Sequence, residues 1–179
     1  TLLPFAFEVR TLRRVEDAAT AIRDMVVRGA PLIGVTAAYG VALALREHPG
    51  DESLAAAIET LVATRPTAVN LHWAAERIRR AVAALPPAAR AARAYAEAAA
   101  IAEEDVASCA AIGRHGLVLL RELAHGKGGE RINVLTHCNA GWLACVDWGT
   151  ALAPVYAAHE AGLAVHVYVD ETRPRSQGA

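Results

Sequence analysis

Cys138 is the residue of this sequence best placed to act as a nucleophile or a proton donor. It follows a short apolar run at residues 132–135 and precedes the turn residues 139–141. This pattern predicts a buried strand, a tight turn and a helix over residues 142–161, interrupted near Pro154. Ligands bind at the carboxyl ends of such strands, and the positive end of a helix favours a thiolate. Cys138 is therefore a candidate catalytic thiol, and the alternative is a buried, inert cysteine at a strand end.

Two arginines fall in turns rather than on helix faces, and each is suited to hold an anionic group. Arg28 precedes the small residues Gly29 and Ala30, which allow the backbone to approach a ligand closely. Arg65 is forced into an extended conformation by Pro66, between two predicted helices. A guanidinium and backbone amides together suit a phosphate group. The alternative for both arginines is an ordinary exposed position in a loop.

The elements that must position these residues form two parts. Apolar residues at helical spacing make the first part helical, and we expect Asn70 to cap the helix that begins at Leu71. The Gly-rich stretch at residues 126–129 then leads into a strand–helix–strand segment whose second strand covers residues 164–169. The helices of the first part are expected over residues 15–27, 32–46, 53–63, from 71 onward, and 88–123.

Composition and spacing argue against several classes of partner and cofactor. The net charge of −1 gives no electrostatic case for binding nucleic acid or an anionic membrane. The three cysteines have no metal-like spacing and indicate free thiols in a reducing compartment. Neither predicted strand is followed by Gly-x-Gly-x-x-Gly, which argues against a dinucleotide. The longest uncharged stretch, residues 29–45, is too short for a comfortable membrane span.

Four motifs, in this order, resemble those of the methylthioribose-1-phosphate isomerase family. That family shares a superfamily with ribose-1,5-bisphosphate isomerase and with the regulatory subunits of the translation-initiation exchange factor. Each motif alone is modest, but four in the right order over nearly the whole chain are specific. The motifs are RGAPLIG at residues 28–34, TRPTAVNL at 64–71, THCNAG at 136–141 and DETRPRSQGA at 170–179.

The resemblance implies an α/β fold in two domains. A mostly helical N-terminal domain would cover residues 1–129, and residues 130–179 would begin a Rossmann-like parallel-sheet domain, cut here after its second strand. The implied activity is an aldose–ketose isomerisation, from 5-methylthioribose 1-phosphate to 5-methylthioribulose 1-phosphate, in methionine salvage. The alternatives are a related isomerase acting on ribose 1,5-bisphosphate or 5-deoxyribose 1-phosphate, and a non-catalytic regulatory subunit of the same fold.

The resemblance also implies roles for particular residues. Cys138 would be the catalytic thiol, and the general acid/base aspartate would lie beyond residue 179, so this stretch alone would be inactive. We expect a cytoplasmic homodimer that binds a sugar phosphate and needs no metal or other cofactor. The substrate would be bound by Arg28, Gly29, Ala30, Arg65 and Gln177.

Overall fold

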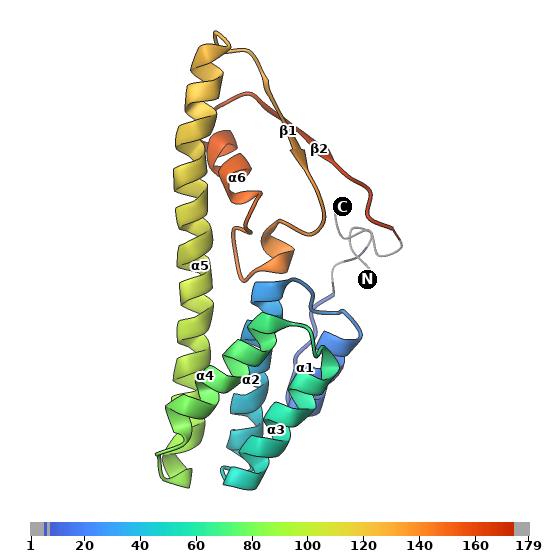
Figure 1. Cartoon of the computed structure of the whole chain (residues 1–179), viewed down its shortest axis with the longest axis vertical. Coiled ribbons are helices and arrows are strands. Elements are labelled where there is room, and N and C mark those ends of the chain that lie inside the picture. The colour runs from blue at the N-terminus through green and yellow to red at the C-terminus, as the bar shows by residue number, and fades with distance from the viewer. Residues whose placement is uncertain (1–5, 7, 174–179) are drawn as a thin grey trace. The chain divides into compact units, whose positions relative to one another are not determined.

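The first part of the chain is a set of helices packed around one apolar helix (Figure 1). The computed structural model describes residue 6 and residues 8–173, and divides into two compact units, Thr1–Glu103 and Glu104–Ala179. The first unit contains α1 (Val15–Arg23), α2 (Ala30–Glu47), α3 (Asp51–Thr64), α4 (Val69–Val82) and the beginning of α5 (Pro87–Gly126).

Helix α2 is the centre of the first unit because its side chains are small or apolar on almost every face. A helix that is hydrophobic all round belongs in a core, and α2 contacts α1, α3 and α4. The neighbours approach closely: a Cβ placed on Gly40 would lie 3.1 Å from Ala18 and Leu61. The side chains of Leu61, Leu71 and Ile78 are fully buried against it.

Helix α4 starts earlier than the sequence predicts. It begins at Val69, so Asn70 lies within its first turn and the prediction that Asn70 caps the helix is wrong. The reason is tertiary: a Cβ on Gly34 of α2 would come 2.9 Å from the Asn70 carbonyl oxygen. This close approach between the two helices holds the backbone of Asn70 against α2.

The second unit contains the predicted pair of parallel strands. Strand β1 (Ile132–Thr136) pairs with β2 (Val165–Val169) in a register that places Thr136 beside Val169. The parallel pairing agrees with the predicted strand–helix–strand order. The expected Rossmann-like start of a parallel sheet is therefore present in outline.

The predicted long helix after β1 is wrong. Residues 142–161 instead form the 3-10 helix η1 (Trp142–Ala144), a series of turns, and the short helix α6 (Ala153–Glu160). Trp148 and Gly149 have positive φ angles of 65° and 81°, which no α-helix accommodates. Pro154 lies in the first turn of α6, where its missing N–H costs nothing, rather than interrupting a longer helix.

The predicted boundary between domains, at residues 126–129, stays a prediction. Helix α5 ends at Gly126, and Gly128 and Gly129 turn the chain with positive φ angles of 65° and 87°. The two compact units, however, divide within α5, after Glu103. Within the described residues, no helix is both long and apolar enough to cross a membrane.

Candidate active site

The carboxyl ends of β1 and β2 bring polar side chains together in the second unit. The Asp170 N–H donates to the Thr136 carbonyl oxygen at 3.3 Å, which continues the ladder by one step. His137 Nδ1 then lies 3.0 Å from Asp170 Oδ2. Both side chains are well exposed, so this pair orients the histidine more than it stabilises the fold.

Cys138 follows this pair in an exposed and strained position. Its φ angle is 62°, a left-handed conformation that costs a residue other than glycine about 1–3 kcal/mol and is concentrated at functional sites. The thiol is one of three free cysteines and, among them, the exposed one. The α-helix expected to begin at residue 142 is absent, and only the three-residue 3-10 helix η1 lies there, so the expected activation of Cys138 by the dipole of a long helix has no basis in this structure.

The loop that carries Cys138 is folded back on itself. The Ala140 carbonyl oxygen accepts hydrogen bonds from the Thr150 N–H at 3.1 Å and the Leu152 N–H at 3.3 Å. A Cβ on Gly149 would lie 2.4 Å from the carbonyl carbon of Gly141, so two backbone segments are in direct contact there. These backbone contacts hold the loop in place of the expected α-helix.

Asn139, next to the thiol, carries an unused donor. Its Nδ2 atom is buried and has no hydrogen-bond partner among the described residues. A buried amide nitrogen left unpaired costs about 1–3 kcal/mol, so such an atom marks a place where a ligand group would be stabilised. Sequence reasoning did not single out Asn139, although it lies in the THCNAG motif.

In the first unit, Arg28 lies in the turn between α1 and α2, and Gly29 is the residue before α2. Gly29 has φ of 105°, a conformation that side chains other than glycine rarely adopt. Its carbonyl oxygen accepts the Ile33 N–H at 3.0 Å, and Ala30 is the exposed first residue of the helix. Arg28 is half-buried. The turn therefore presents small residues at a helix N-terminus, which is a favourable place for an anion.

Arg65 ends α3 and is also half-buried. Its backbone is extended, with φ of −146° and ψ of 77°, as the following Pro66 requires. Its Nη1 atom is buried and has no hydrogen-bond partner among the described residues. A buried guanidinium nitrogen without a partner is ready to donate to a carboxylate or phosphate.

The structure brings the turns of Arg28 and Arg65 toward one another within the first unit. Helix α2 begins two residues after Arg28, and α4 begins four residues after Arg65. The contact between Gly34 and Asn70 joins the first turns of these two helices. The helices that follow the two arginines are therefore in direct contact near their N-terminal ends, which carry partial positive charge. Gln177, the remaining predicted site residue, lies outside the described residues.

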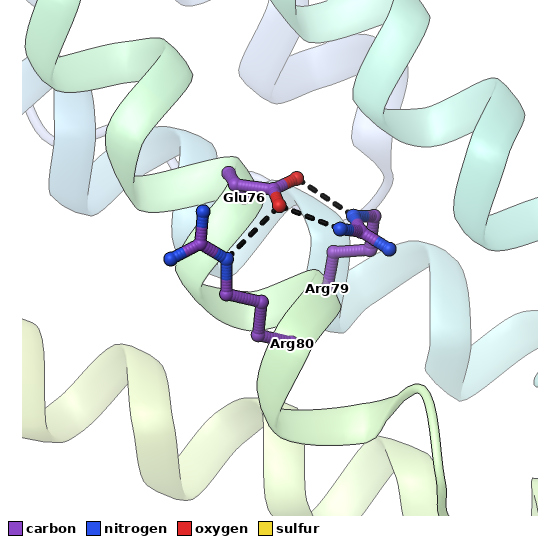
Figure 2. A network of polar contacts seen from close by, with 3 residues as sticks. All are labelled: Glu76, Arg79 and Arg80. Carbon is purple, nitrogen blue, oxygen red and sulfur yellow. Dashed lines mark hydrogen bonds and ion pairs between the residues drawn. The ribbon is translucent and has the colours of Figure 1, made fainter.

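A groove of about 700 Å³ lies beside the Arg65 turn, but its charges are already paired. Figure 2 shows Glu76 between two arginines of α4: it accepts from Arg79 at 2.6 Å and from Arg80 at 3.0 Å. These bonds, above all that from Arg79, lower the pKa of Glu76 to about 2. Arg77 lies over the Trp73 ring, 5.5 Å from its centroid. The groove is therefore a weaker candidate for phosphate than the turns of Arg28 and Arg65.

The comparison with protein families identifies the class to which the chain belongs. A model described as the Initiation factor 2 subunit family matches residues 26–179, so the chain belongs to this family. Two solved structures share its fold. One is 5-methylthioribose 1-phosphate isomerase from Pyrococcus horikoshii, with a TM-score of 0.85 and 40% identity over 99% of this chain and 50% of that one. The other is subunit delta of the translation initiation factor eIF-2B from A. fulgidus, with a TM-score of 0.84 and 42% identity over 99% and 52%.

Curated relatives are more similar still. A methylthioribose-1-phosphate isomerase of Methylorubrum populi is 65% identical over the whole of this chain. One of Rhodospirillum centenum is 63% identical over the same extent. The chain spans about half the length of the curated relatives it matches, 49% and 48% in these two cases. The predicted resemblance and the predicted fold class are confirmed.

Proposed function

We propose that the protein containing this chain is an aldose–ketose isomerase of methionine salvage. It would convert 5-methylthioribose 1-phosphate to 5-methylthioribulose 1-phosphate. The observation that carries the proposal is the 65% identity, over the whole chain, to a relative named methylthioribose-1-phosphate isomerase. The exposed thiol at a strand end supports it, because this reaction needs groups that manage protons or developing charge.

The chemistry explains why these residue types suit the substrate. A sugar 1-phosphate cannot open to a free aldehyde, because its anomeric oxygen is bonded to phosphorus. The ring must open with the phosphate retained while hydrogen moves from C2 to C1. A site for this reaction must hold a dianion firmly and exclude water from the reacting carbons.

In this proposal Cys138 is the catalytic thiol. Its exposure and strained backbone support the assignment, since strain of this kind is concentrated at active sites. The Asn139 amide would donate to a substrate oxygen, which would satisfy its buried nitrogen. The resemblance gives the general acid/base role to an aspartate outside this sequence, so neither Asp147 nor Asp170 is assigned that role.

The phosphate would be bound by the turns of the first unit. Arg65 would donate its buried, unpartnered Nη1 nitrogen to a phosphate oxygen. Arg28 would contribute a second guanidinium, and Gly29 and Ala30 would offer backbone amides at the start of α2. Gln177 is proposed as a further substrate ligand from the resemblance alone.

We also propose that the protein is a cytoplasmic homodimer that acts without a cofactor and does not bind nucleic acid. Its three cysteines are free, which is usual in a reducing compartment. The net charge of −1 gives no electrostatic case for nucleic acid.

A second candidate is a non-catalytic regulatory subunit, which the similarity to the eIF-2B delta subunit favours. An isomerase assay of the full-length protein on a panel of sugar 1-phosphates separates the two. The panel contains 5-methylthioribose 1-phosphate, ribose 1,5-bisphosphate and 5-deoxyribose 1-phosphate, with ketose formation followed by NMR. We expect the first compound to be converted with the highest kcat/KM. Preference for another member would reassign the substrate, and no conversion of any would favour the regulatory subunit.

A further inference from the structure

Two buried cysteines and an aspartate, none of them assigned to the proposed active site, meet in the second unit. Asp105 and Cys109 lie one turn apart on α5, and Cys145 follows η1. One ligand atom from each, the two Sγ atoms and a carboxylate oxygen, all lie within 4.8 Å of one another. Each cysteine is only 2% exposed. No local sequence pattern indicates this cluster, because Cys145 is distant from the other two residues along the chain.

Close packing of α5 against the start of α6 brings the three residues together. A Cβ on Gly113 would lie 3.2 Å from the Ala153 carbonyl oxygen, and one on Gly116 would lie 2.3 Å from Pro154. Such contacts leave no room for side chains at Gly113 and Gly116. The turns that precede α6 therefore also pack against α5. The cluster is therefore held by the backbone packing around it.

The aspartate is oriented toward the thiols by a second contact. The Val146 N–H donates to Asp105 Oδ2 at 2.9 Å, while Oδ1 lies 3.9 Å from Cys109 Sγ. The apolar side chains of Ala144 and Trp148 pack around the two sulfurs. The carboxylate thus has one oxygen fixed by the backbone and the other directed at the sulfurs.

We propose that Asp105, Cys109 and Cys145 bind a divalent ion of the zinc class. Zinc takes thiolate and carboxylate ligands, with Zn–S bonds of about 2.3 Å, so two sulfurs in a tetrahedral site lie about 3.8 Å apart. The observed separations lie within about 1 Å of this geometry, which side-chain rotation can supply. Three protein ligands leave a fourth position for water or another group. Such an ion would fasten the segment after η1 to α5.

The surroundings of the two thiols disfavour their charged form. Burial raises the pKa of both thiols, that of Cys145 to about 12, and the hydrogen bond between the thiols raises it further at Cys145. The charges of Asp105 and Asp147 also raise the pKa of Cys109. A bound zinc ion would supply the positive charge that stabilises both sulfurs as thiolates.

The test is a titration of the reduced, chelator-treated protein with Co²⁺ as a spectroscopic substitute for zinc. We expect one ion per chain, with a near-ultraviolet charge-transfer band from thiolate. Cys109→Ser and Cys145→Ser should abolish the band, and Asp105→Asn should weaken affinity by at least about tenfold. Cys138→Ala, which removes the exposed thiol instead, should leave the band unchanged. Circular dichroism of each variant establishes that it is folded.

Thermal unfolding in Zn²⁺ provides a second readout. Zinc should raise the unfolding midpoint of the parent protein and of Cys138→Ala, should raise that of Asp105→Asn by less, and should not raise that of Cys109→Ser. The proposal is overturned if no thiolate band appears, or if the band disappears in Cys138→Ala and persists in Cys109→Ser. It is also overturned if Cys109 and Cys145 are isolated as a disulfide that binds no metal after reduction.

Discussion

The two units of the chain differ in how their interiors are filled. The first unit surrounds α2 with the fully buried side chains of Leu61, Leu71 and Ile78. In the second, the apolar cluster around the cysteines is small, and strand side chains such as Leu135 (70% exposed) and Tyr168 (53% exposed) face outward. The first unit is therefore held together by an extensive apolar core. The described part of the second unit is held together mainly by a few backbone contacts.

This difference matches the roles proposed for the two units. In the first unit, the close approach of Gly34 to Asn70 packs together the helices α2 and α4, which follow the turns of Arg28 and Arg65. In the second unit, the thiol of Cys138 lies in a strained loop held by hydrogen bonds to Ala140. In the proposed function, substrate binding would thus depend on turns between well-packed helices, and the chemical step would depend on a strained loop.

Replacing the thiol should have the largest effect. Cys138→Ser in the full-length protein should lower kcat by about 10²- to 10⁴-fold, since the group that manages protons or charge is lost. The unfolding midpoint should change little, because the side chain is exposed. Steady-state kinetics and thermal unfolding check both statements, with the exposed Ser108→Ala on α5 as the control. Turnover close to that of the parent protein would remove Cys138 from the mechanism.

The next largest effect is expected at Gly149, where the loop meets its own backbone. Gly149→Ala should destabilise the protein by at least about 2 kcal/mol, because a Cβ there meets Gly141 at 2.4 Å and the φ angle is 81°. Gly162→Ala is the matched control, since Gly162 has a similar φ of 76° with open space around it. Denaturant unfolding should show a clearly smaller loss for the control. Equal losses of stability in the two variants would mean that the cost comes from the positive φ angle alone and not from the contact with Gly141.

Removing a proposed phosphate ligand should have a moderate effect. Arg65→Ala should raise KM by about 10- to 100-fold with a smaller change in kcat, because a charged hydrogen bond to the substrate is lost. Arg23→Ala removes an exposed arginine of the same unit and serves as the control. A drop in kcat with KM unchanged would contradict a binding role for Arg65.

The smallest effect is expected from the paired charges of α4. Glu76 has its pKa lowered to about 2 from 4.5, so its pairing stabilises the fold fully above about pH 4.5, and this contribution is lost as the pH falls toward 2. The pair is exposed, and its effect on stability is modest. Glu76→Gln should lower the unfolding midpoint slightly at pH 6, with the difference shrinking between pH 4.5 and 2. A difference that grows on acidification would contradict the lowered pKa.

Much of the first unit could be predicted because its helices are defined by local patterns. Apolar spacing located α2, α3 and α5 to within a few residues. Glu97 of α5 is a charged residue that is only 8% exposed, and it pairs with Arg77 of α4 and with Arg93. Such a partner from another helix leaves no mark in the local sequence.

The second unit was less predictable because its loop is shaped by distant contacts. Residues 142–152 have apolar side chains at helical spacing, but hydrogen bonds to Ala140 and the positive φ angles of Trp148 and Gly149 override it. The strand-end rule selects Cys138 as a candidate, and its catalytic role stays a prediction. The pairing of His137 with Asp170 depends on strand register, which the sequence alone does not provide.

The division between binding and chemistry is tested most directly by measuring substrate binding to the inactive variant. Calorimetric titration of the full-length Cys138→Ser protein with 5-methylthioribose 1-phosphate should show an affinity close to that of the parent protein for its substrate, with no ketose formed. The Arg65→Ala protein, titrated in the same way with an unreactive substrate analogue, should bind about 10- to 100-fold more weakly than the parent binds that analogue. Loss of binding in Cys138→Ser, or unchanged binding in Arg65→Ala, would contradict the account.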